Sequence, residues 1–170
     1  MQLENKRPDK PINKYLVFLR DIVRKSRIYK LHIFNIGKIK IGENVHLGKG
    51  AQWSVPQSAK LGNNIAIAGN FLVQTNLEMG DECLISSKVS FIGHDHDLFD
   101  EAGSAYFSGR LEPSTVKLEG NNFIGFGATL LGDITVGQGA VVGAHALVLS
   151  DVPSNAIVAG VPAKIIGQRE

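Results

Sequence analysis

The sequence has little of what secreted, disulfide-bonded or membrane-spanning proteins require. Its single cysteine, Cys83, excludes an internal disulfide framework and suits a reducing compartment. No apolar run approaches the roughly 18 residues of a membrane span, and no signal-peptide pattern opens the chain. What is present is 170 residues with 44% hydrophobic content, which is enough for one sizeable core. We therefore expect a protein with a single core that resides in the cytoplasm.

The modest net charge of +2 conceals a strongly basic N-terminal segment. Residues 1–40 hold eleven lysines and arginines against three acidic residues, a formal charge of +8, and the remainder carries −6. Apolar and basic residues of this segment alternate at the spacing of an amphipathic helix: Ile12, Tyr15, Leu16, Leu19, Ile22 and Val23, with Lys14, Arg20, Arg24, Lys25 and Arg27 between them. Two interpretations are open. The helix packs its apolar side on the rest of the chain and exposes its basic side, or it lies on a membrane surface.

From Ile41 the chain repeats every six residues, as in IGENVH, LGNNIA and MGDECL. The repeat slips by two residues at Ala59 and Lys60, runs to FIGHDH at His96, and resumes with LEGNNF at Leu118. The first position is apolar in all fifteen units, the second is Gly, Ser or Ala in ten, and the fifth is apolar in twelve. Six is not a helical period, and each glycine would cost a helix about 1 kcal/mol, so a helical architecture is excluded.

A six-residue period is typical of a short strand followed by a bend. Three such strands close a triangular coil of about 18 residues, and the coils stack at the inter-strand spacing of about 4.8 Å. The first and fifth positions point inward, so Cys83 is a core residue, and we expect the second-position glycines to supply backbone angles that a β-carbon penalises. The sequence predicts an all-β parallel β-helix of about five triangular coils over residues 41–170, preceded by the helical segment 1–40 and closed by an exit segment, 153–170.

The Leu/Ile/Val-Gly-x-x-small-x cadence and the ending VGAHALVLSDVPSNAIVAGVPAKII resemble the hexapeptide-repeat acyltransferases. The similarity runs from Ile41 to about Lys164, and is nearest to sugar O-acetyltransferases of the maltose, galactoside and nodulation type and of capsule and lipopolysaccharide synthesis. The resemblance implies a left-handed prism, although parallel strands are usually connected with right-handed crossovers. It also implies a homotrimer with active sites between subunits, and transfer of an acetyl group from acetyl-CoA to a hydroxyl of a sugar or glycan intermediate. We expect no metal and no nucleic-acid partner.

The repeat is interrupted over residues 97–115, directly after the two histidines of FIGHDH. A loop of this length without structure of its own is usually functional. Its apolar residues indicate that it packs over a neighbouring subunit and walls the acceptor pocket. In the similar sugar acetyltransferases the catalytic histidine occupies the sixth position of the last unit before the loop. That residue is His96 here, and His94 stays the alternative. A neutral imidazole can accept a hydroxyl proton near pH 7.

Two further groups are needed around such a base. The second ring nitrogen needs an acceptor, which is a backbone carbonyl or a carboxylate from Asp95, Asp97 or Glu82. The oxyanion of the tetrahedral intermediate needs a donor, which is a backbone N–H or the amide of Gln74 or Asn76. The resemblance points to Gln74.

The resemblance also implies an acyl-donor site between two subunits, along the final coils. CoA would contact residues at the matching positions: Gly125, Phe126, Ala144, Leu149, Ser150 and Lys164. Lys164 has an independent reason, because it puts a cation where a polyphosphate should pass. Phe126 replaces a small residue of the family pattern, and Leu149 and Ser150 replace a more polar pair.

Three other interpretations stay open: a xenobiotic acetyltransferase of the same fold, a metal-dependent enzyme of the carbonic anhydrase type, and a non-enzymatic β-helix scaffold. The carbonic anhydrase type has histidines five residues apart, whereas His94 and His96 are two apart. A scaffold has no reason to interrupt its repeat with an apolar loop. The sequence does not identify the acceptor. The basic segment favours an acceptor presented at a membrane, with peripheral contact at its inner face.

Overall fold

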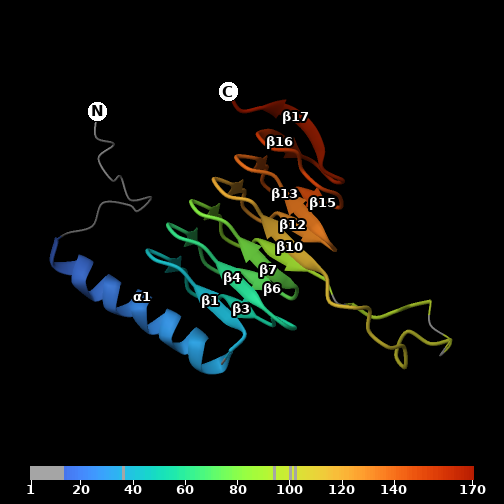
Figure 1. Cartoon of the computed structure of the whole chain (residues 1–170), viewed down its shortest axis with the longest axis horizontal. Coiled ribbons are helices and arrows are strands. Elements are labelled where there is room, and N and C mark those ends of the chain that lie inside the picture. Colours follow the sequence, from blue (N-terminus) through green and yellow to red (C-terminus); the bar gives the residue numbers. More distant parts are fainter. Residues whose placement is uncertain (1–13, 36, 94, 100, 102) are drawn as a thin grey trace.

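The body of the protein is a three-sided prism of short strands (Figure 1). The computed structural model describes residues 14–35, 37–93, 95–99, 101 and 103–170. Sheet 1 contains β1 (Ile39–Ile41), β4 (Ala59–Leu61), β7 (Asn76–Met79), β10 (Thr115–Leu118) and β13 (Ile134–Val136). Sheet 2 contains β2 (His46–Leu47), β5 (Ala66–Ile67), β8 (Leu84–Ile85), β11 (Phe123–Ile124), β14 (Val141–Val142), β16 (Ala156–Ala159) and β17 (Lys164–Gln168). Sheet 3 contains β3 (Gln52–Trp53), β6 (Leu72–Val73), β9 (Ser90–Ile92), β12 (Thr129–Leu131) and β15 (Leu147–Val148).

Each coil contributes one strand to each sheet, and successive coils pair in parallel. Ile39 lies opposite Ala59 in sheet 1, and Val73 lies opposite Phe91 in sheet 3. Five complete coils are followed by a partial sixth that ends in β16, on which β17 lies antiparallel. The predicted parallel β-helix is therefore confirmed, and the exit segment adds an antiparallel strand at the C-terminal end.

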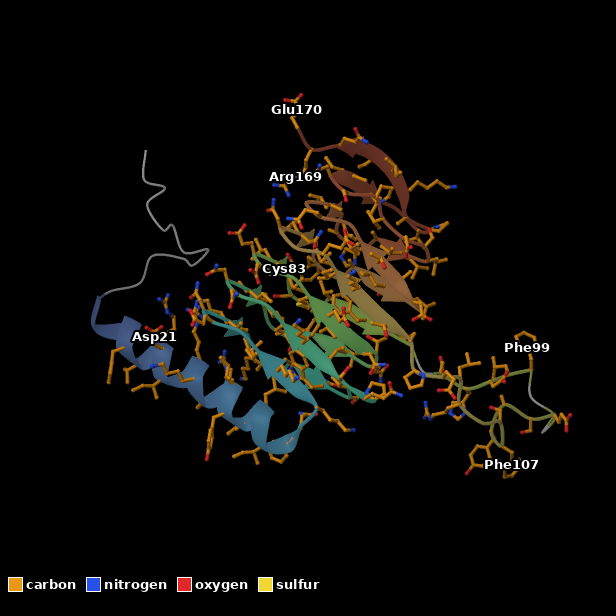
Figure 2. All side chains as sticks on the ribbon, viewed as in Figure 1. Asp21, Cys83, Phe99, Phe107, Arg169 and Glu170 are labelled. Carbon is orange, nitrogen blue, oxygen red and sulfur yellow. The ribbon has the colours of Figure 1, made fainter. Side chains whose placement is uncertain are left out.

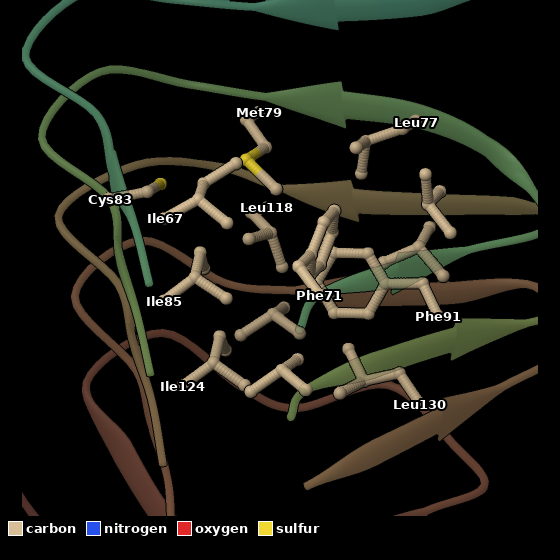
Figure 3. Packing of buried hydrophobic residues seen from close by; sticks show 14 of the residues in the cluster. Ile67, Phe71, Leu77, Met79, Cys83, Ile85, Phe91, Leu118, Ile124 and Leu130 are labelled. Atoms are coloured by element: carbon tan, nitrogen blue, oxygen red, sulfur yellow. The ribbon is translucent and has the colours of Figure 1, made fainter. Parts of the chain in front are cut away.

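The core is a column of inward side chains along the prism axis, drawn in part in Figure 3. The two largest fully buried side chains, Phe71 and Phe91, come from the fifth and the first position of their units and meet edge to face at 5.2 Å between ring centroids. Cys83 is 1% exposed and packs in the same column, as predicted for a fifth position. The expected inward direction of the first and fifth positions is confirmed.

The second-position glycines serve close packing rather than unusual backbone angles, so that part of the prediction is wrong. A β-carbon on Gly125 would lie 2.6 Å from the backbone nitrogen of Ala144 in the next coil, and one on Gly48 would lie 2.5 Å from the backbone nitrogen of Gly69. Neither glycine is among those with positive φ. Positive φ falls instead on the fourth position of the units: Asn44, Gly50, Asn64, Asn70, Glu82, Lys88, Asn121, Gly127, Gly139 and His145. Asparagine tolerates this conformation better than most residues do.

Helix α1 (Lys14–Phe34) lies across the N-terminal end of the prism (Figure 1). The segment is helical as predicted. Of the two interpretations left open, packing of the apolar side on the rest of the chain is wrong for most of the residues that suggested it. Leu19, Ile22 and Val23 are 57%, 48% and 46% exposed, whereas Leu31 is buried. Ile12 lies outside the described residues. None of the described helical residues forms a helix long and apolar enough to cross a membrane.

The interruption of the repeat leaves the prism between β9 and β10 as a projecting arm, described at residues 97–99, 101 and 103–114 (Figures 1 and 2). Figure 2 shows the side chains of Phe99 and Phe107 far from the prism body, and they are 98% and 76% exposed. Tyr106 contacts Phe107 edge to face at 4.9 Å and is also exposed. The arm of one chain therefore presents aromatic side chains that this chain does not cover.

Candidate active site

The base of the arm is a short antiparallel ladder that holds His96 at the edge of the prism. Asp97 N donates to Gly109 O at 2.9 Å, Leu111 N donates to Asp95 O at 2.9 Å, and His96 forms a bridge with Arg110 between them. Asp95 Oδ1 also accepts a hydrogen bond from the backbone N–H of His96 at 2.8 Å. The backbone around His96 is thus fixed from both sides of the arm.

The imidazole of His96 is oriented by Ser108. Its Nδ1 lies 3.3 Å from the carbonyl oxygen of Ser108 and 3.3 Å from Ser108 Oγ. The hydroxyl of Ser108 donates its hydrogen to the carbonyl of Ala105 at 3.0 Å, so its oxygen is left to accept, as the carbonyl must. Both partners therefore require the proton on Nδ1, and Nε2 is left with its lone pair. This is the tautomer that a general base uses.

A pocket of about 440 Å³ lies beside this imidazole. Its lining comes from three successive coils and from the returning arm: Ser54, Gln74, Ile92, Gly93, Asp95, His96 and Arg110. The pocket brings together three of the predicted residues, His96, Gln74 and Asp95. Gln74 is exposed there, with an amide side chain that can donate a hydrogen bond.

The other predicted catalytic residues lie elsewhere. Asp97 Oδ1 accepts the backbone N–H of Phe99 at 3.1 Å, and Glu82 occupies a bend between sheets 1 and 2. Asn76 Oδ1 accepts the backbone N–H groups of Gln57 and Ser58, so it closes a bend. The sequence left a backbone carbonyl and a carboxylate open as acceptors for the second ring nitrogen of His96. In the structure this acceptor is the backbone carbonyl of Ser108. His94 lies outside the described residues.

Sequence reasoning missed Ser54, Ser108 and Arg110. Ser108 acts through its carbonyl, which every residue has, so no sequence signal could find it. Arg110 was visible as a cation close to the point where the repeat resumes. Ser54 occupies the second position of its unit, one coil below Gln74, as the pairing of Trp53 with Val73 requires. The repeat register was therefore sufficient to find it.

The root of the arm is tightly packed behind the pocket. Gly93 leaves no room for a side chain, because a β-carbon there would overlap Ser114 Oγ and lie 2.9 Å from Thr75 Cγ2. The hydroxyls of Thr75 and Ser114 are buried without a hydrogen-bond partner among the described residues. Thr115 N, where β10 begins, donates to Asp133 Oδ1 at 2.7 Å. This bond fastens the returning chain to the next coil.

The residues predicted for the acyl donor lie at two different corners of the prism. Gly125, Phe126 and Ala144 occupy bends between sheets 2 and 3, where Lys88 Nζ lies 5.5 Å from the ring centroid of Phe126. Leu149 and Ser150 follow β15 at the corner that carries His96 two coils earlier. Lys164 begins β17 and is exposed.

An apolar row runs from the pocket toward the C-terminal coils. Ile92 pairs with Leu131, and Leu131 lies below Leu149, since Leu130 pairs with Val148. Leu131 and Leu149 are 41% and 52% exposed. The row links the His96 pocket to the predicted donor residues of the same corner. Leu131 was not predicted.

No cysteine is among the described residues that line the pocket, and Cys83 lies in the core. Burial raises the pKa of the Cys83 thiol, which disfavours the reactive thiolate. Among the described residues no group of three or more His, Cys, Asp or Glu side chains could hold a metal ion. The arrangement at His96 can accept a proton from a hydroxyl or amine that enters the pocket.

Known proteins similar to this chain were found by sequence and by structure. The WbbJ protein of Escherichia coli (strain K12), whose name assigns it as a lipopolysaccharide biosynthesis O-acetyl transferase, is 29% identical over 163 residues, which cover 89% of this chain and 83% of WbbJ. Galactoside acetyltransferase in complex with coenzyme A matches with a TM-score of 0.68 at 21% identity, over 94% of this chain and 84% of that one. AntD is an N-acyltransferase from Bacillus cereus, solved in complex with dTDP and 3-hydroxybutyryl-CoA. It matches with a TM-score of 0.68 at 23% identity, over 79% of this chain and 74% of AntD. No protein-family model matches the chain.

The structural similarities establish the fold as a left-handed parallel β-helix of hexapeptide repeats. With the repeat, the three-sided coil and the similarity to WbbJ taken together, the chain resembles the hexapeptide-repeat acyltransferases in sequence and shares their fold. It is an enzyme of the acyltransferase class.

Proposed function

We propose that the chain is an O-acetyltransferase that moves an acetyl group from acetyl-CoA to a hydroxyl of a sugar or glycan intermediate, with His96 as the general base. The observation that carries the proposal is the orientation of His96. Its Nδ1–H is held by Ser108, and its ring borders a pocket that also contains Gln74. Galactoside acetyltransferase and AntD, which share the fold, were solved with coenzyme A and with an acyl-CoA.

The chemistry is a direct transfer. Nε2 of His96 takes the proton of the acceptor hydroxyl as the oxygen forms a bond to the thioester carbon. Gln74 donates a hydrogen bond to the oxyanion of the tetrahedral intermediate. When the carbon–sulfur bond breaks, the CoA thiolate leaves and the imidazolium returns the proton to the sulfur. No covalent enzyme intermediate is required.

The apolar row supports a path for the donor. The pantetheine arm of CoA is a chain of methylene and amide groups that can lie along Ile92, Leu131 and Leu149 with its thiol end at the pocket. Because the predicted donor residues lie at two corners of the prism, one chain cannot offer them all to one CoA molecule. We therefore propose a homotrimer in which Gly125, Phe126 and Ala144 come from the neighbouring protomer, with Ser150 and Lys164 completing the path.

The basic segment 1–40 favours an acceptor presented at a membrane, as lipid-linked saccharides are. This is also the substrate setting that the name of WbbJ suggests. Arg110 in the pocket suits an acceptor that carries a phosphate or carboxylate near its reacting hydroxyl. A xenobiotic acetyltransferase is the second candidate, because none of the described residues that line the pocket requires a sugar.

The test is the release of free CoA from acetyl-CoA in the presence of sugars, nucleotide sugars, lipid-linked glycans and antibiotics. We expect His96→Ala to lose at least about a hundredfold in kcat/KM, the usual scale for a general base. His94→Ala is the matched control and should lose much less. Equal losses would contradict the assignment of the base to His96, and turnover only with antibiotics would favour the second candidate.

A further inference from the structure

Helix α1 carries an exposed apolar face that points away from the prism. At 3.6 residues per turn its members fall within an arc of about 100°. They are Phe18, Leu19, Ile22, Tyr29 and Ile33, and they are 71%, 57%, 48%, 69% and 47% exposed. We call this set the outer face. Exposed apolar surface of this kind marks a site of contact with another molecule or a membrane.

The inner side of α1 is where its arginines lie. Arg27 Nη1 donates to the carbonyl oxygen of Leu47 at 2.9 Å, and Arg24 and Arg27 border a hollow with His46 of the first coil. Leu31 is buried on the same side. The contacts that hold α1 on the prism therefore use the side opposite the outer face, and they give the outer face no role in packing.

We propose that the outer face inserts into the headgroup region of an anionic lipid bilayer. Lys25 and Lys30 are exposed and lie on either flank of the outer face, where they can reach lipid phosphates while the apolar side chains enter the acyl boundary. The helix carries six lysines and arginines against Asp21 alone. That charge attracts anionic lipid and opposes contact between the outer faces of two copies.

The position of α1 suits a flat partner. Figure 1 shows α1 across the end of the prism, with the described part of the chain continuing only on one side of it. The exposed outer face lies on the opposite side of the helix from the contact of Arg27 with Leu47. About 30 Å of helix can therefore touch one plane along its length. The inference rests on the proposed function in one respect: it explains how an acceptor linked to lipid would be reached.

The experiment measures binding of the full chain to sedimenting vesicles of phosphatidylcholine alone or with about 30% phosphatidylglycerol. We expect binding to the anionic vesicles that weakens with salt. Replacing Phe18, Ile22 and Tyr29 together by Gln should lower the partition coefficient at least about a hundredfold, because three large side chains no longer enter the apolar layer. Glutamine keeps the helix intact, which circular dichroism will check.

Three comparisons separate the contributions of charge, apolar contact and catalysis to vesicle binding. The double variant Lys25→Glu and Lys30→Glu should bind anionic vesicles at least about tenfold more weakly, since each lysine contributes roughly fivefold near such a surface. The double variant Ile165→Gln and Ile166→Gln removes apolar side chains of similar exposure from β17 and should bind as the parent does. His96→Ala should also bind normally, so a failure of the catalytic proposal does not affect this test.

Two outcomes would overturn the proposal: the parent protein does not bind anionic vesicles, or the triple glutamine variant binds them as well as the parent. If the triple variant keeps its vesicle binding and also changes its oligomeric state in sedimentation, the outer face is a contact between copies of this chain.

Discussion

The carboxylate of Asp133 offers a way to loosen the arm without touching the pocket. Its Oδ1 accepts the backbone N–H of Thr115 at 2.7 Å, at the residue where the arm returns to the prism. Asp133→Ala leaves that half-buried N–H without its partner. The cost of such a loss is about 1–2 kcal/mol. For a chain of this length, about 2–4 °C per kcal/mol gives a fall in Tm of about 2–8 °C.

A matched variant distinguishes anchoring of the arm from general stability. Asp81 Oδ1 accepts the backbone N–H of Asn63 at the same 2.7 Å, at a bend between sheets 1 and 2. Asp81→Ala should therefore cost similar stability. Only Asp133→Ala loosens the point where the arm that carries Ser108 and Arg110 rejoins the prism, so we expect kcat/KM to fall at least about fivefold more in that variant.

Thermal melting and CoA release, measured on the same preparations, check both quantities. Asp133→Asn keeps an acceptor oxygen and should restore Tm and kcat/KM to nearly parental values. If Asp133→Ala and Asp81→Ala lose activity equally, the hydrogen bond to Thr115 does not hold the arm in its active position. If Asp133→Ala melts like the parent, the estimate of its contribution to stability is wrong.

Two further predictions concern the coils. Gly48→Ala should lower the free energy of unfolding in urea by about 1–3 kcal/mol, because its β-carbon meets the backbone of the next coil; Gly167→Ala, which has only ordinary contacts, should change it by less than about 0.5 kcal/mol. The raised pKa of Cys83 means that the folded state favours the protonated thiol. That contribution to stability is complete below the thiol pKa of the unfolded chain and is lost as pH rises toward the folded value. Cys83→Ala should therefore lose less stability between neutral and alkaline pH than the parent, and the parent thiol should resist a disulfide reagent until the protein unfolds.

The prism could be predicted because its determinants are local. Inward side chains recur every six residues, and each short strand needs only its own apolar residues and a bend. The role of the second-position glycines could not be read from one coil. Gly125 is required by the backbone nitrogen of Ala144, which lies in the next coil, and that distance exists only after stacking.

Part of the candidate site could likewise be predicted from the sequence, and part could not. His96 and Gln74 were predicted from register and resemblance, and both border one pocket. Ser108 and Arg110 reach it because the arm folds back as an antiparallel ladder on Asp95–Asp97, a path that the six-residue period does not encode. The same fold-back of the arm brings the carbonyl of Ser108, rather than a carboxylate, to Nδ1 of His96.

Helix α1 shows why an amphipathic pattern does not tell which side is buried. A stack of parallel strands leaves open backbone groups at each end, and these must be paired or covered. At the C-terminal end β17 pairs with β16. At the N-terminal end Arg27 of α1 donates to the carbonyl of Leu47. Carbonyl groups at an open edge attract arginine rather than leucine, so the arginines of α1 turn toward the prism beside Leu31, and most of its apolar residues turn outward. The requirement to cap the first coil thus leaves an apolar face available to a membrane.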